Sequence, residues 1–180
     1  MKKIISLAIL AVMAFTASAQ LHIGGTVNAW RNGSEHETTL TIMPEVGYTI
    51  SDNLIIGTEI GWNHFHKKGL NNNLFGIAPY ARYTFLQSGI VGLFVEGGFD
   101  VFAGKTSFEN GGESDTATTF GIGFKPGASF KVSEKVTLVT KFGFLGYEGA
   151  NDAAKAAGYD EGWGLRFTGN NIEIGFFYTL

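Results

Sequence analysis

The sequence predicts an all-β fold, an eight-stranded antiparallel up-and-down transmembrane β-barrel. Three observations carry this prediction. Apolar residues alternate with polar or small ones along most of the chain, glycine (26 of 180 residues) and aromatic residues (14%) are abundant, and only 16% of the residues are charged. Soluble proteins carry about 25% charged residues. Alternating apolar residues favour strands with one lipid-facing side, and a sheet in lipid must close because an open edge leaves its backbone N–H and C=O groups without hydrogen bonds.

The start of the chain has the features of a secretory signal peptide. Two lysines precede the apolar run 4–15, and residues 17–19 read Ala-Ser-Ala, which fits an A-x-A cleavage site. The apolar run is too short to be a convincing membrane-spanning helix. We therefore expect a signal peptide over residues 1–19 and a single barrel domain over residues 20–180.

The first four predicted strands place their larger apolar residues on one face. They cover residues 21–31, 38–50, 54–65 and 74–85. In the first strand, Ile23 and Val27 share the outward face. In the third strand, Ile60 and Trp62 point outward while Glu59 points inward. This period of two is that of a strand with two different faces.

The last four predicted strands follow the same rule. They cover residues 91–101, 118–130, 136–144 and 172–180. In the seventh, both Phe142 and Phe144 are expected to point outward. In the eighth, large apolar residues occupy every even position. Residues 163–167 also alternate, but on odd positions, so we interpret them as the upper part of the eighth strand, separated from the rest by a bulge near residues 169–171.

The connections and the aromatic residues indicate how the barrel is oriented. Short turns follow the second, fourth and sixth strands, whereas the other connections include the long polar segments 105–117 and 148–162. Outer-membrane barrels have this layout, with the long loops outside the cell. Aromatic residues are expected in two girdles, one at the turn end and one at the loop end: Tyr48, Tyr83, Phe85, Phe130 and Tyr178; Trp62, Phe75, Phe120 and Phe144. A soluble lipocalin-like barrel would instead place apolar residues inside.

The end of the chain carries a recognisable spacing. Glu173, Gly175, Tyr178 and Leu180 follow the pattern polar-x-Gly-x-x-aromatic-x-hydrophobic, which resembles the C-terminal assembly signal of bacterial outer-membrane barrels. Leu180 departs from that pattern, because the last residue is usually Phe. With the signal peptide, the eight alternating segments and the run Phe-Gly-Ile-Ala-Pro-Tyr-Ala-Arg-Tyr at 75–83, the chain is similar to the small OmpA/OmpX-type outer-membrane β-barrel family.

This resemblance covers essentially the whole mature chain. It implies a bacterial outer-membrane location, and only weakly an activity. We expect a monomer whose partners are outer-membrane lipids and the barrel assembly machinery.

Charged residues that point inward are expected to meet in the lumen. We call this set the charge belt: Glu45, Glu59, Arg82, Glu96, Lys125, Lys141 and Glu173. Hairpin geometry gives the expected cross-strand pairs: Glu45 with Glu59, Glu96 with Lys125, Lys125 with Lys141, and Lys141 with Glu173. Arg82 is expected near Glu59 and Glu96. The two glutamates Glu45 and Glu59 would repel each other unless Arg82 reaches them.

The charge belt predicts a closed lumen. Eight strands make a barrel just wide enough for side chains to fill, and buried charges need partners. We therefore interpret the belt as a structural network of ion pairs that plugs the barrel. A gated path for protons or ions is the alternative.

Composition and charge exclude several functions. The chain has no cysteine, so it forms no disulfide, thiolate nucleophile or cysteine metal site. Its net charge of −3 becomes more negative when Lys2 and Lys3 leave with the signal peptide, which argues against nucleic acid as a partner.

Catalytic and metal sites find little support in the sequence. A Ser-His-acid site needs a serine beside a histidine, but Ser129 lies near the turn end of its strand, whereas His64 and His66 lie near the loop end. These histidines lack an evident third metal ligand. The glycines of residues 121–127 do not form the dinucleotide-binding pattern. We expect no catalytic residue, no metal and no cofactor.

The long loops carry more acidic than basic residues, which is typical of solvated loop surface and also suits an extracellular partner. The sequence thus predicts an integral outer-membrane barrel with a structural or surface-interaction role. Two alternatives stay open: a narrow, porin-like transport pore, and a membrane-embedded lipid-modifying enzyme.

Overall fold

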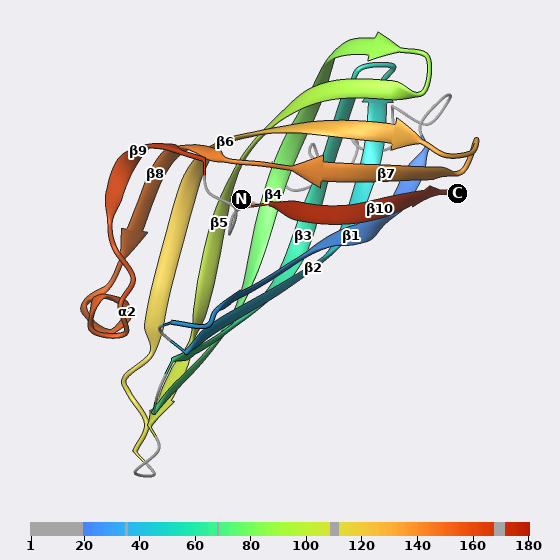
Figure 1. Ribbon diagram of the computed structural model, residues 1–180. Coiled ribbons are helices and arrows are strands. Elements are labelled where there is room, and N and C mark those ends of the chain that lie inside the picture. The colour runs from blue at the N-terminus through green and yellow to red at the C-terminus, as the bar shows by residue number, and fades with distance from the viewer. Residues whose placement is uncertain (1–19, 35, 68, 109–111, 168–171) are drawn as a thin grey trace, which may run out of the picture.

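The computed structural model is a closed eight-stranded antiparallel β-barrel (Figure 1). It describes residues 20–180 other than 35, 68, 109–111 and 168–171. The expected signal peptide, residues 1–19, lies outside the described residues. The elements are β1 (Leu21–Asn32), β2 (Glu37–Ser51), β3 (Leu54–Lys67), β4 (Leu70–Ser88), β5 (Val91–Phe108), β6 (Ala117–Lys131), β7 (Val136–Lys141), β8 (Phe144–Ala150), α2 (Asp152–Ala156), β9 (Gly162–Arg166) and β10 (Glu173–Thr179).

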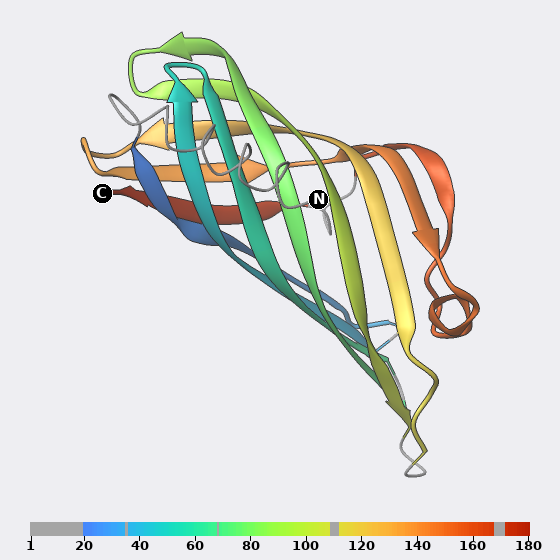
Figure 2. The same cartoon turned by 180° about the vertical axis from the view of Figure 1, so that it is seen from behind.

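The strands form a closed ring. Neighbouring strands pair in the order β5-β4-β3-β2-β1-β10-β7-β6, and β6 pairs back to β5. The first and last strands close the barrel through an antiparallel pairing in which Ile23 lies opposite Tyr178 and Val27 lies opposite Ile174. Figures 1 and 2 both show β1 and β10 side by side. The predicted fold class is therefore confirmed.

One wall strand is broken in the middle, between β7 and β8. β7 and β8 pair with successive parts of the same edge of β6, first at Gly127–Lys131 and then at Thr119–Phe124. On their other side, β7 pairs with β10 and β8 pairs with β9. β9 overlaps the expected upper part of the eighth strand, residues 163–167, while the bulge expected at 169–171 falls outside the described residues.

The break in the seventh strand corrects one expectation. Gly143 has a φ of 74°, in the left-handed region that favours glycine. Relative to β6, the chain has one extra residue at this point, which reverses the parity of β8, so Leu145 and Tyr147 are exposed outside. Phe144 instead lines the lumen, so its expected place in the outer girdle is wrong.

The strands near the loop end are longer than expected. β4 begins at Leu70 and β5 continues to Phe108, so both extend into segments predicted as loop. The loop after β8 contains the short helix α2. Its N-cap residue Asn151 accepts a hydrogen bond from the N–H of Ala154 at 2.9 Å.

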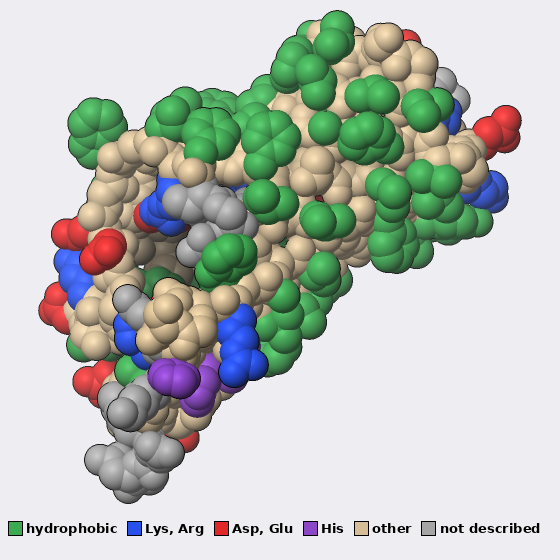
Figure 3. All heavy atoms as spheres, in the orientation of Figure 1, with side chains coloured by type: hydrophobic (Ala, Val, Ile, Leu, Met, Phe, Trp, Pro, Cys, Tyr) green, Lys and Arg blue, Asp and Glu red, His purple; other side chains and the backbone are tan. Residues whose placement is uncertain are grey.

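Apolar side chains cover the outside of the barrel. Ile60, Phe75, Ile122 and Ile174 are each more than 60% exposed. Figure 3 shows hydrophobic side chains spread over this face of the wall, with charged and histidine side chains gathered toward its two ends. The inside of the wall holds buried charges, which contradicts the lipocalin-like alternative.

The packed core lies in the lumen. Phe94, Val139 and Phe177 form one buried cluster. Leu74, Ala117, Ala150 and Ala154 form another, in which α2 packs against the wall. Among the described residues, no helix combines the length and the hydropathy that a bilayer crossing requires.

Candidate functional site

The charge belt occupies the middle of the lumen. Each of its seven side chains comes from a different strand: Glu45 from β2, Glu59 from β3, Arg82 from β4, Glu96 from β5, Lys125 from β6, Lys141 from β7 and Glu173 from β10. All seven point inward because they share the inner parity of their strands. Five of these residues are less than 5% exposed, and Lys141 is completely buried.

Arg82 joins three strands and is enclosed by aromatic rings. Its Nε and Nη2 donate to Glu96 Oε2 at 2.9 and 2.6 Å, and Nη2 also donates to Glu45 Oε1 at 3.2 Å. The guanidinium carbon lies 4.5 to 4.9 Å from the ring centroids of Phe177, Phe94 and Tyr80. A guanidinium in such a position is held by charge-assisted hydrogen bonds and by cation–π attraction together.

Lys141 joins the remaining carboxylates. Its ammonium forms an ion pair with Glu59 and another with Glu96 at 2.9 Å, and lies 3.7 Å from Glu173. Lys125 forms a second ion pair with Glu173 at 2.8 Å. The hydroxyl of Thr26 donates to the other oxygen of Glu173 at 3.1 Å. The network is therefore continuous from β4 to β10.

Three of the four expected cross-strand pairs are present in the register. Glu45 lies opposite Glu59, Glu96 opposite Lys125, and Lys141 opposite Glu173.

The fourth expected pair is wrong. Lys141 lies opposite Gly127 instead of Lys125, because Lys131 pairs with Thr137 and the turn is thus centred on Glu134, one residue later than assumed. This shift keeps two ammonium groups from facing each other directly, which would be destabilising.

The two adjacent glutamates Glu45 and Glu59 pair with different cations. Arg82 reaches Glu45, whereas Glu59 pairs with Lys141 from the opposite wall. Tyr80 also donates its hydroxyl to Glu45. The alternation in the sequence places Tyr80 on the inner face of its strand. It does not reveal which side chains Tyr80 meets across the lumen, so the contact with Glu45 was not predicted.

The residues considered for catalysis are kept apart. The Ser129 hydroxyl donates to the carbonyl of Gly92 at 3.5 Å. The imidazoles of His64 and His66 contact the side-chain amides of Asn73 and Asn71, at the other end of the barrel. Within the described part of the chain, no three His, Asp or Glu residues come together as metal ligands.

The C-terminal residues close the barrel. Gly175 lies where a Cβ atom would meet the carbonyl oxygen of Gly25 at 2.0 Å, so any larger residue would push β1 and β10 apart. The N–H of Leu180 donates to the carbonyl of Leu21 at 3.0 Å. Tyr178 and Leu180 are exposed on the outside. Recognition of these residues by the assembly machinery stays a prediction.

Comparison with known proteins points to one family and one fold. A family model described as "Outer membrane protein beta-barrel domain" matches residues 4–179. The structure is similar to that of neisserial surface protein A (13% identity, 90% of this chain and 96% of that chain covered, TM-score 0.54). It is also similar to the N-terminal β-barrel domain of OprF from Pseudomonas aeruginosa (11% identity, 90% and 96% covered, TM-score 0.53). No curated protein matches the chain.

Proposed function

Because the chain belongs to the family of outer-membrane protein β-barrel domains, we propose that it serves the bacterial outer membrane as a non-conducting structural and surface-interaction protein. The chain is exported through its signal peptide, residues 1–19, and is inserted by the barrel assembly machinery as a monomer. The outer ends of the strands and the loops between them then face the outside of the cell.

The observation that carries this proposal is the network of buried ion pairs that the charge belt forms across the lumen. Glu59 and Lys141 come from opposite walls and meet in the middle, and both are nearly or completely buried. Arg82, Phe94 and Phe177 fill the space on the turn side of this pair. A solute that crossed the barrel would have to break several buried ion pairs, each of which costs several kcal/mol to leave unpaired.

The outer end supports a role in surface contacts. Ion pairs among exposed side chains line it, including Lys67 with Glu37, Lys105 with Glu113 and Lys155 with Glu161. The carboxylate of Glu161 holds the pKa of the Lys155 ammonium above its usual value through a hydrogen bond. Such a charged rim suits a polar or charged partner.

Conductance in planar lipid bilayers tests this function. The purified protein should give no steady ion current, whereas a porin of known conductance in the same membrane should. A stable current through the wild-type protein would replace the structural role with that of a narrow pore.

A further inference from the structure

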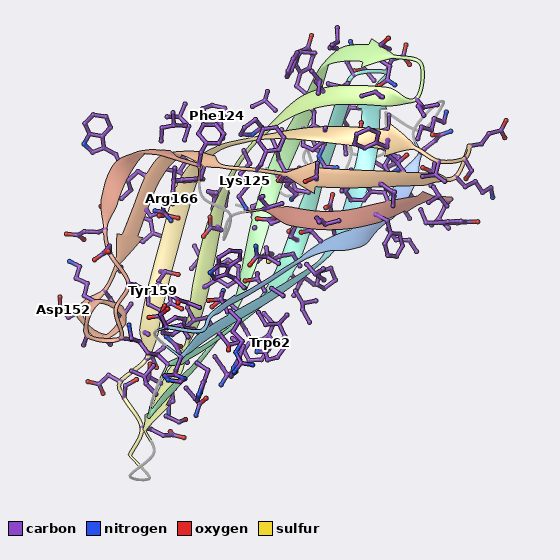
Figure 4. The ribbon with its side chains drawn as sticks, in the orientation of Figure 1. Trp62, Phe124, Lys125, Asp152, Tyr159 and Arg166 are labelled. Atoms are coloured by element: carbon purple, nitrogen blue, oxygen red, sulfur yellow. The ribbon has the colours of Figure 1, made fainter. Side chains whose placement is uncertain are left out.

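A cavity of about 380 Å³ lies in the outer half of the lumen, on the loop side of the charge belt. The residues that line it include Asp100, Phe102, Lys125, Phe144, Tyr159 and Arg166. These six come from β5, β6, β8, β9 and the segment after α2. Figure 4 shows Lys125, Tyr159 and Arg166 on separate elements of this half of the barrel. The volume lies within the range of small-molecule sites.

The two cations that line the cavity already have carboxylate partners. Lys125 pairs with Glu173 at 2.8 Å, and Arg166 pairs with Glu148. Asp100 lines the same cavity. Among the described residues its carboxylate has no cation within 4.0 Å and accepts no hydrogen bond, and the favourable charge that acts on it from further away is that of Lys125.

Among the described residues, the other cations that point into the lumen already have carboxylate partners of their own. Arg82 is shared by Glu45 and Glu96, and Lys141 is shared by Glu59, Glu96 and Glu173. Apart from the Arg166 and Glu148 pair, the described residues of the belt and the cavity therefore include five inward carboxylates, on β2, β3, β5 and β10, and three cations. A partly buried carboxylate without a counter-charge is costly, so the cavity favours a positively charged occupant.

The walls of the cavity suit the apolar part of a ligand. Phe102 follows Asp100 on the inner face of β5, and on the other side the ring of Phe144 lies where a Cβ atom on Gly123 would meet it at 2.7 Å. Leu74 and Met43 line the same space. Burial raises the pKa of the Tyr159 phenol to about 12, so this side chain is neutral and presents an aromatic ring and a hydroxyl. Aromatic rings attract organic ammonium groups in addition to burying their carbon atoms.

We propose that this cavity is a binding site for an organic cation, with the ammonium group paired to Asp100 and the apolar body packed against Phe102 and Phe144. A metal ion fits less well, because divalent cations take several oxygen ligands and the described residues bring no group of three together. An anion fits less well, because both lining cations are already paired. The inference goes beyond the structural role and does not depend on it.

Calorimetric titration of the purified barrel in a neutral maltoside detergent tests the site. The probe is phenethylammonium chloride, and phenylacetate and phenethyl alcohol serve as anionic and neutral analogues of the same body. The cation should bind saturably at one site per chain, and both analogues should bind at least tenfold more weakly. Asp100→Asn, which keeps the side-chain volume, should weaken binding of the cation at least tenfold.

The matched control is Asp52→Asn, at an exposed turn on the opposite end of the barrel, which should bind the cation as wild type does. Heat-modifiable gel mobility shows that each variant is folded. Equal binding by wild type and Asp100→Asn, tighter binding of phenylacetate, or no saturable binding of the cation would overturn the site. A conducting wild type would overturn the proposed function and leave this result intact.

Discussion

Lys141 on β7 and Glu59 on β3 form an ion pair across the full width of the barrel. The two strands lie four places apart in either direction around the ring of eight, so no two wall strands are more distant. The pair is buried at both ends. It therefore ties opposite walls together at the level where a pore would need to be open.

Replacing the lysine of this pair should leave buried carboxylates without a counter-charge. Lys141→Met is expected to lower the free energy of unfolding by about 3–5 kcal/mol, because it leaves Glu59 and Glu96 with fewer cations in a buried site. Adding Glu59→Gln should recover part of that loss, since the neutral amide no longer needs the cation. Urea titration in detergent, followed by tryptophan fluorescence, measures both. Strictly additive losses in the double variant would show that the two residues do not interact.

Arg82→Ala should destabilise the barrel far more than loss of a surface cation. The change removes hydrogen bonds to Glu45 and Glu96 and empties the space among Phe94 and Phe177, for an expected loss of about 3–5 kcal/mol. The control is Lys105→Ala, because the ion pair of Lys105 is more than half exposed and screened by water. Similar urea midpoints for the two variants would contradict the enclosed position of Arg82.

A substitution at Gly143, where the wall strand is broken between β7 and β8, should destabilise the barrel. Gly143→Ala places a Cβ in a left-handed backbone conformation and 2.6 Å from the ring of Phe167, so we expect a loss of about 1–3 kcal/mol. Gly164→Ala, on the neighbouring strand β9, meets no atom within 4 Å and is the matched control. Thermal unfolding of both variants in detergent measures the difference, and equal midpoints would show that the break tolerates a side chain.

Deleting Tyr178–Leu180 should block assembly in cells. The deletion removes the pairing of Thr179 with His22 and of Tyr178 with Ile23, which leaves the turn end of β1 without its partner in lipid. Leu180→Phe should assemble normally, because the side chain points outward and is exposed. Outer-membrane fractionation and heat-modifiable mobility report the outcome. Normal assembly of the deleted chain would show that the resemblance of this end to an assembly signal has no functional meaning.

The strands of the barrel wall were predicted well because they follow from local features of the sequence, namely alternation and short turns. Alternation alone gave the outward placement of residues such as Ile60 and Ile174, and short turns gave the register that sets Glu45 opposite Glu59. The assumed centre of one turn, wrong by a single residue, moved Lys125 two places relative to Lys141. An error in the position of the turn centre shifts every cross-strand pair of that hairpin, because opposed residues are counted from this centre.

Contacts across the lumen could not be predicted in the same way. Tyr80 shares the inward parity of Arg82, and Asp100 that of Glu96. Partners on non-adjacent strands, however, depend on how far each long side chain reaches across the ring. The inward position of Phe144 depends on the backbone at Gly143, where the alternating pattern continues unbroken in the sequence. These features follow from tertiary packing, which overrides the local pattern.

The wide sequence separation of the ion pairs also constrains how the chain enters the membrane. Glu59 meets its lysine 82 residues later, and Glu173 meets a threonine 147 residues earlier. A hairpin of β2 and β3 inserted alone would carry two carboxylates into lipid with no cation between them, which is strongly unfavourable. The first hairpins should therefore stay at the membrane–water interface until the later strands have paired with them. Insertion would then be concerted, and pairing of β10 would complete the barrel.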